Sequence, residues 1–427
     1  MTDRARWSSG QIAGCLVVLV LALAVRAGYL VTCADSGRHD GPIRVQDTAE
    51  STPAVAAIEN GQLHWSGQQS LYDWSISILA RIWSEPGRRD QIVRWIQCVF
   101  GALAAVFYFL AARLAFRSAA VALLAGLFGA LSPFWVAATA DMNDAVACAF
   151  LLSVCLWAGT RGGQAVRGGT SWLFGVTLAA LAYMRVGFLP FGWIALAWYL
   201  FRSRLLPGGW ISAVLAIVGV LTVALPWGYR NYLQSQDVYP QLRTLYVELW
   251  EGNNPEATGG SWRQPAPSDK SDRQLLQEVG QEVAHNPAGT LQRRLWAGLS
   301  FFFGEDFLRQ QRLWRENAAG ENGPTAPGWF RSSYAAALYG WLLVMLLLAV
   351  LGWRWSYDWR TAARPLALAL LWIPLPYLLG QAAPLAGPRL PLDGVLMTYT
   401  AFALAGRKSA TEVAETPQTV RRVPIYR

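Results

Sequence analysis

Long apolar runs alternate with short polar segments along most of the chain. A helix needs about 20 apolar residues to cross a hydrocarbon core of about 30 Å. The pattern therefore predicts an all-α polytopic membrane protein. About ten transmembrane helices are expected, at residues 12–33, 91–112, 117–136, 143–160, 171–185, 187–202, 209–228, 333–353, 365–382 and 388–406.

Two long polar segments, residues 34–90 and 229–332, interrupt these runs. The first contains amphipathic stretches near 47–60 and 70–84, which we expect to lie on the membrane as interfacial helices. The second has a middle rich in Pro and Gly, followed by helical stretches near 270–284 and 288–303, and it is also expected to carry interfacial helices. We expect one transmembrane domain over residues 1–406. The polar tail, 407–427, has a composition typical of disorder.

The region 171–202 forms either one long helix or two short helices with a turn near Arg185 and Gly187. The choice decides on which side every later loop lies. With a turn and a cytoplasmic N-terminus, every cytoplasmic segment is basic, as the positive-inside rule requires. A single helix would break that pattern, so we expect the turn, and both long loops then lie on the non-cytoplasmic side.

The composition supports a lipid-embedded protein. Charged residues make up 15% of the chain, whereas soluble domains carry about 25%. The 22 Trp residues suit membrane–water interfaces. The net charge of +9 is explained by Arg in the cytoplasmic loops. Since no basic run with interleaved aromatic residues stands in a soluble segment, nucleic acid is not expected as a partner.

The five Cys residues form no CxxC pair, and the three His residues are widely spaced. We therefore expect neither a disulfide framework nor a metal site. No motif for soluble nucleotide chemistry is present, and no cofactor is expected. The first apolar run, from Ile12 to about Cys33, is too long for a signal-peptide core and is interpreted as a retained helix.

Charged residues distant in sequence fall on the non-cytoplasmic face of this topology. A charge near the bilayer costs a few kcal/mol unless it is paired or hydrated, so such residues are often functional. Carboxylates at helix starts can instead be caps, and arginines at helix ends can snorkel to headgroups. Arg26, within the first span, is expected to pair with another helix or snorkel. The candidates are Asp47, Asp141, Asp144, Arg185, Arg230 and Arg389.

Several segments, in order, resemble a known family. The chain is similar to bacterial GT-C glycosyltransferases, near the protein mannosyltransferases and the lipid A aminoarabinose transferase. The most specific segment is Leu225-Pro226-Trp227-Gly228-Tyr229-Arg230-Asn231-Tyr232. The others are Gln46-Asp47, residues 56–61 (AAIENG), Ser132-Pro133 with Asp141 and Asp144, residues 181–185 (LAYMR), residues 249–255 (LWEGNNP), Gly259-Gly260, residues 285–294 and residues 388–393 (PRLPLD).

The resemblance implies transfer of a sugar from a polyprenyl-phosphate-linked donor to a protein, lipid or glycan acceptor. It also implies a bacterial inner membrane location, with the site facing the periplasm or exterior, and inversion at the sugar carbon. Asp47 is the expected catalytic base, although Thr48 stands where many relatives have a second acid.

The remaining roles divide by charge. Asp144 and Asp141, in that order, are expected to orient hydroxyl groups or to hold an arginine. The arginines are expected to bind the donor phosphate, because guanidinium groups match phosphate oxygens. They are Arg230, Arg389 and Arg185.

Two other functions fit an anionic lipid substrate. A lipid-linked sugar transporter or flippase would place charges near the bilayer midplane and often shows repeat symmetry. Here the charges lie at one edge and no repeat is visible. A non-catalytic envelope protein that binds polyprenyl phosphate is the third possibility, and the lack of a second acid after Asp47 leaves it open.

Overall fold

The computed structural model describes residues 9–35, 70–83, 86–141, 144–166, 168–254, 270–304, 328–359, 362–380 and 388–415. Every regular element in these ranges is helical, which confirms the all-α expectation for them. The elements are α1 (Ser9–Asp35), α3 (Leu71–Ile82), α4 (Pro86–Phe116), α5 (Ala119–Leu131), α6 (Pro133–Ala138), α7 (Ala145–Gly162), α8 (Gly168–Met184), η1 (Val186–Phe188), α9 (Leu189–Arg204), α10 (Gly209–Ser235), α11 (Gln241–Asn253), α12 (Asp272–His285), α13 (Pro287–Leu299), η2 (Ser300–Gly304), α15 (Gly328–Trp355), η3 (Ser356–Trp359), α16 (Arg364–Trp372), α17 (Pro374–Gly380) and α18 (Leu390–Glu415).

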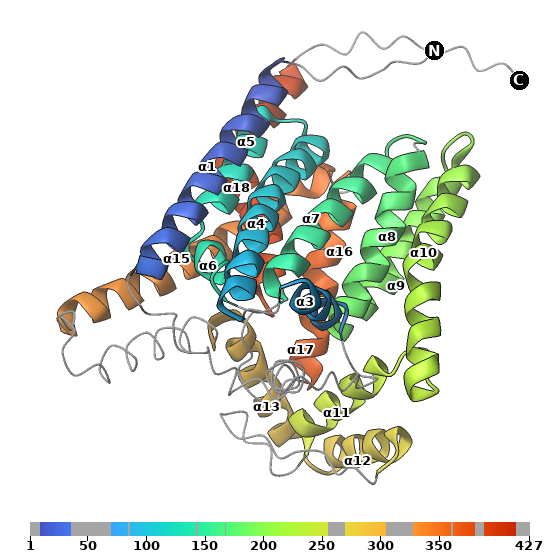
Figure 1. Cartoon of the computed structure of the whole chain (residues 1–427). Helices are drawn as coiled ribbons and strands as arrows, with labels where there is room; N and C mark the ends of the chain where they lie inside the picture. The colour runs from blue at the N-terminus through green and yellow to red at the C-terminus, as the bar shows by residue number, and fades with distance from the viewer. Residues whose placement is uncertain are drawn as a thin grey trace, which may run out of the picture.

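The long helices form one bundle, from α1 on one side to α10 on the other (Figure 1). Helices α11, α12 and α13 gather at one end of this bundle, which we call the loop end (Figure 1). At the opposite end, Arg202 of α9 donates to the Gly163 carbonyl, and Gln164 donates to the Leu114 carbonyl. Helices α4, α7 and α9 each carry arginine in their last turn, as expected of a cytoplasmic end.

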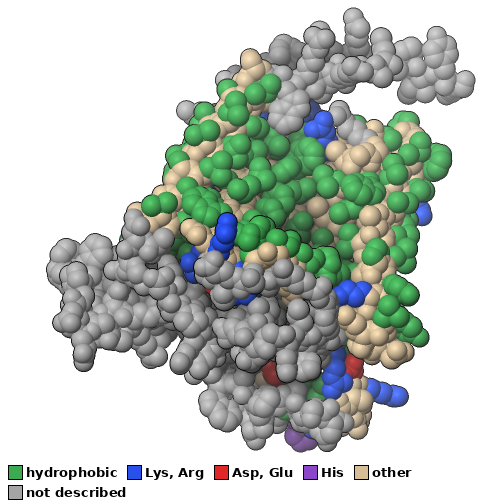
Figure 2. Space-filling model, viewed as in Figure 1, with side chains coloured by type: hydrophobic (Ala, Val, Ile, Leu, Met, Phe, Trp, Pro, Cys, Tyr) green, Lys and Arg blue, Asp and Glu red, His purple; other side chains and the backbone are tan. Residues whose placement is uncertain are grey.

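Four helices in the described ranges are long and apolar enough to cross a membrane: Ser9–Thr32, Arg88–Phe116, Ala145–Gly162 and Gly209–Ser235. Shorter apolar helices lie at Ala119–Leu131, Tyr339–Trp355, Arg364–Gly380 and Leu390–Gly406. Hydrophobic side chains dominate the described surface over the bundle (Figure 2). The chain is therefore an integral membrane protein. Each expected span falls on one or two helices, while the exact number of crossings stays a prediction.

Helix α10 shows how the bilayer fits the bundle. It has 27 residues, so it is about 40 Å long and exceeds the hydrocarbon core. Trp210 is 68% exposed near its start and Tyr229 is 67% exposed near its end. These side chains are about 28 Å apart along a straight helix. This spacing matches the two aromatic belts of a membrane protein.

Two local breaks interrupt the predicted spans. The expected turn at Arg185 is present, because α8 ends at Met184 and α9 begins at Leu189. The span predicted at 117–136 is divided at Pro133. Proline disfavours a helical backbone conformation at the preceding residue, Ser132, and it is the first residue of α6. The last helix continues to Glu415, so the expectation of a disordered tail is wrong for residues 407–415.

Arg26 is fully buried in α1 and pairs with another helix, one of the two outcomes expected. Its guanidinium donates to the carbonyls of Gly129 at 2.9 Å and Ala130 at 3.1 Å, near the end of α5. Carbonyls in the last turn of a helix have no partner within that helix. The cation supplies that partner and complements the negative end of the helix dipole.

Candidate active site at the loop end of the bundle

Asp144 and Arg185 form an ion pair between the start of α7 and the end of α8. Arg185 has an extended backbone, with φ −148° and ψ 117°. Its Nε donates to Asp144 Oδ2 at 3.0 Å, and its Nη2 donates to Oδ1. Such bidentate pairs are among the strongest charge-assisted hydrogen bonds. The two side chains are only 18% and 19% exposed, so the pair is largely desolvated.

This geometry excludes two simpler interpretations. Asp144 precedes α7, but its side chain makes no capping hydrogen bond to that helix. Arg185 holds a carboxylate instead of extending freely to headgroups. The Cys148 thiol, one turn into α7, lies 3.7 Å from Asp144 Oδ2 and donates weakly to it. Asp144 therefore holds an arginine, one of the arrangements expected for this acid.

The end of α8 is fixed by side chains from the second long loop and from α17. The Tyr239 hydroxyl donates to the Ala182 carbonyl at 2.6 Å, and its ring meets Tyr183 at 4.9 Å. Burial raises the pKa of Tyr239 well above its usual value, so it remains a donor. Tyr377 of α17 lies beside Arg185. A Cβ at Gly187 would lie 2.9 Å from the Tyr377 hydroxyl, so a side chain at this position would require Tyr377 to shift.

Arg230 lies among aromatic side chains near the end of α10. Its guanidinium carbon is 4.6 Å from the centre of the Trp227 ring, a cation–π distance. Trp74 of α3 meets Trp227 edge-on at 5.5 Å, and Tyr183 meets it at 6.2 Å. The Arg230 side chain is partly exposed and also donates to Asn231 at 3.4 Å. Tyr183 therefore contacts Trp227, the ring beside Arg230, from the end of α8 that precedes Arg185.

Arg389 has a different environment. It is fully buried and pairs with Asp393, one turn later in α18, at 2.9 Å. It also donates to the Phe302 carbonyl and lies 5.0 Å over the Phe134 ring. A phosphate would have to displace these partners. Its expected contact with the donor stays a prediction, and its burial excludes snorkelling.

The two remaining candidates are less defined. Asp141 is half-buried between α6 and α7, and its N–H donates to the Ala138 carbonyl at 3.2 Å. Asp47, the expected base, lies outside the described residues. Among the residues that the structure describes, no cluster of His, Cys, Asp or Glu side chains is suited to hold a metal ion.

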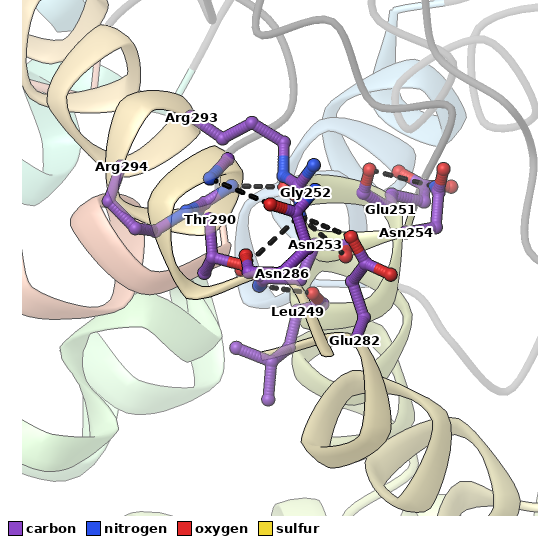
Figure 3. A network of polar contacts seen from close by, with 11 residues as sticks. Leu249, Glu251, Gly252, Asn253, Asn254, Glu282, Asn286, Thr290, Arg293 and Arg294 are labelled. Atoms are coloured by element: carbon purple, nitrogen blue, oxygen red, sulfur yellow. Dashed lines mark hydrogen bonds and ion pairs between the residues drawn. The ribbon is translucent and has the colours of Figure 1, made fainter. Parts of the chain in front are cut away.

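Sequence reasoning did not select a polar network in the second long loop (Figure 3). Arg293 of α13 is buried and donates to Glu282 at 2.9 Å and Thr290 at 3.1 Å. Arg294 donates to the carbonyls of Gly252 and Leu378, at the ends of α11 and α17. Burial lowers the pKa of Arg294 to about 10, and the charge of Arg293 adds to this effect.

The network joins two segments that were noted for family resemblance only. Asn253 of α11 donates to the Leu379 carbonyl of α17 at 2.8 Å. The segment 249–255 supplies the acceptors, and 285–294 supplies the arginines, so the two segments meet in space. The outer helices are thereby attached to the bundle, close to the element that carries Tyr377.

Comparison with known proteins finds a similarity over the central part of the chain. The sequence model of a family described as dolichyl-phosphate-mannose-protein mannosyltransferases matches residues 70–229. Over this segment the chain is similar to that family of glycosyltransferases, which use a lipid-phosphate-linked sugar as donor. The expectation of an enzyme of this class, with a lipid-phosphate-sugar donor, agrees with the description of the matching family.

The matched segment, residues 70–229, includes the Asp144–Arg185 pair and Trp227, and it ends one residue before Arg230. It also includes α3 and α4, which begin at the loop end. Arg389 and the network of Arg293 and Arg294 lie beyond it.

Two solved structures of an Archaeoglobus fulgidus oligosaccharyltransferase are similar to the whole chain. The apo form has 15% sequence identity and a TM-score of 0.46. The form in complex with an inhibitory peptide and a dolichol-phosphate has 14% identity and a TM-score of 0.47. In both cases the match covers 94% of this chain and 52% of the other, so this chain spans about half the length of these proteins. No curated protein matches the sequence.

Proposed function

We propose that this protein transfers a sugar from a polyprenyl-phosphate-linked donor to an acceptor on the non-cytoplasmic side of the membrane. The observation that carries the proposal is the gathering of Arg185, Arg230 and Asp144 at the loop end of the bundle. Arginines whose guanidinium groups are held by a carboxylate and an indole ring are suited to a lipid-borne phosphate. The basic ends of α4, α7 and α9 support a cytoplasmic location for the opposite side.

The proposed reaction is a direct displacement. An acceptor hydroxyl gives its proton to the Asp47 carboxylate as its oxygen bonds to the anomeric carbon. The bond from that carbon to the phosphate oxygen breaks, and polyprenyl phosphate leaves with the electron pair. Arg230, assisted by Arg185, stabilises the negative charge that develops on the phosphate. Attack opposite the leaving group inverts the sugar carbon.

The acids near α7 have supporting roles in this scheme. Asp144 orients Arg185, because both of its carboxylate oxygens accept from that side chain. Asp141 is proposed to orient hydroxyl groups of the sugar or acceptor from its half-buried position. The contact of Arg389 with the donor phosphate stays a prediction outside this scheme, since its donors are directed at Asp393 and the Phe302 carbonyl and attach α18.

The test uses purified protein, a panel of radiolabelled polyprenyl-phosphate sugars and a membrane extract as the source of acceptor. Labelled product is expected from the parent protein. Asp47→Asn should abolish it without loss of membrane expression, while Asp40→Asn, a neighbouring acid in the same loop, serves as a matched control. Turnover by Asp47→Asn at the parent level would remove Asp47 from the role of base. Movement of intact lipid across vesicles without labelled product would overturn the transferase proposal in favour of a flippase.

A further inference from the structure

Helix α13 carries its polar and apolar side chains in the reverse of the usual arrangement. Its exposed positions are 287, 288, 291, 292, 295, 296 and 299, and all but Gln292 are apolar. Leu291, Leu295, Trp296 and Leu299 are 61%, 62%, 51% and 51% exposed. We call these four side chains the outer stripe of α13.

The opposite face of α13 is polar and buried. Arg293 is only 8% exposed, and Thr290 is equally buried beside it. Both belong to the network that holds α13 against α11, α12 and α17. A soluble helix buries leucine and leaves arginine in water. Burial of the cation with exposure of the leucines therefore indicates an apolar medium outside the stripe.

The position of α13 identifies that medium. The helix leads directly into η2, where Phe301 is fully buried and meets the Tyr377 ring at 5.3 Å. The next residue, Phe302, accepts a hydrogen bond from Arg389 at the start of α18. The C-terminal end of α13 therefore lies beside α17 and the start of α18, at the end of the bundle that these apolar helices help to form.

We propose that α13 lies in the outer leaflet, with its outer stripe at the boundary between headgroups and acyl chains. A short amphipathic helix binds this region through its buried apolar area. Trp296 fits because indole rings prefer the membrane interface. The surface binds lipid, and it does not depend on the proposed transfer reaction.

The placement has a consequence for the site. The buried face of α13 holds the end of α11 through Arg294 and the Gly252 carbonyl. The membrane would therefore set the height of the second-loop helices above the bundle. A lipid-borne phosphate arrives at the same level, whereas an acceptor from the aqueous side must pass these helices.

The test places an environment-sensitive fluorophore on the stripe in the full-length protein. Leu295→Cys is labelled with nitrobenzoxadiazole and reconstituted in nanodiscs with or without lipids that carry a nitroxide on the acyl chain. Gln281→Cys, at an exposed polar position of α12, is the matched control. The parent protein, labelled in the same way, gives the background from its own cysteines. Leu299→Cys provides a second stripe position if Leu295→Cys fails to fold.

The stripe label should emit at shorter wavelength than the control and lose at least half of its emission with nitroxide lipid. The control should keep its emission. A blue-shifted label that is not quenched would mean that protein, either another segment of this chain or a second copy, covers the stripe. That result would overturn the proposal, as would a label that emits as it does in water.

Discussion

Gly252→Ala tests whether the attachment of the second loop to the bundle depends on close helix contact. Gly252 lies in the last turn of α11, where a Cβ would be 2.2 Å from the Gly380 carbonyl oxygen and 3.0 Å from Arg294. Contacts below 3.0 Å essentially never occur for real Cβ atoms. Alanine therefore forces α11 and α17 apart by roughly 1 Å, a form of overpacking that costs about 1–3 kcal/mol.

Two further effects set the net result. Alanine has a higher helix propensity than glycine, which stabilises the folded state by up to about 1 kcal/mol and offsets part of this cost. The displacement also strains the hydrogen bond between Asn253 and the Leu379 carbonyl, 2.8 Å long, and the bond from Arg294 to position 252. We therefore expect a net destabilisation of roughly 1–2 kcal/mol, which lowers the apparent Tm by roughly 1–2 °C in a chain of this size.

The assay is thermal unfolding of the purified protein in detergent, followed by near-ultraviolet circular dichroism. Gly280→Ala in α12 is the matched control, because a Cβ there meets nothing within 4 Å. It should leave the apparent Tm unchanged or raise it. If the proposed site is correct, Gly252→Ala also lowers sugar transfer by up to about 100-fold, since a shift of about 1 Å can have that effect. Equal Tm values for the two variants would refute the reasoning.

Three other changes test the loop end of the bundle. Asp144→Asn leaves the largely buried Arg185 without its charge partner, so we expect a loss of about 3–5 kcal/mol in thermal unfolding; adding Arg185→Gln should restore much of the stability but no transfer. Tyr239→Phe removes a hydroxyl donor to α8, and its apparent Tm should fall by the equivalent of about 1 kcal/mol; an unchanged Tm would show that the hydrogen bond contributes nothing. Hydrogen bonds from Lys270 and then Trp250 lower the pKa of Glu278, so this stabilisation is present above pH 4.5 and is lost as pH falls through the folded-state value. The parent should therefore lose stability more steeply than Glu278→Gln below pH 4.5, and parallel pH profiles would contradict this.

The helices were predictable because each apolar run is long enough, or nearly long enough, to cross the hydrocarbon core as a helix. The turn at Arg185 was also predictable, because arginine in the loop after α9 had to lie on the basic side. The division at Pro133 carried a local signal, since proline lacks the N–H and restricts the residue before it. The extension of α18 beyond residue 406 gave no such signal, because its polar composition is equally typical of a tail.

The contacts within the site depend on how helices distant in sequence pack against one another, which the sequence pattern does not predict. Asp144 and Arg185 were both selected, but their pairing depends on how α7 and α8 pack side by side. Arg389 and Asp393 had a readable signal, the spacing of one helical turn that places their side chains together. Arg293 and Arg294 were passed over because burial of a loop arginine depends on acceptors that other helices supply.

The contact between Arg26 and α5 has a consequence for how the protein is made. During synthesis α1 enters the bilayer before α4 and α5 exist, and an arginine near the centre of a lone helix costs about 2.5–3.5 kcal/mol. The strongly apolar remainder of α1 can offset that cost until the carbonyls of Gly129 and Ala130 arrive. The first helix thus inserts with an arginine that becomes paired only when α5 has inserted. Exchanging it for a generic anchor without the arginine should impair integration of α5 even though the anchor itself inserts.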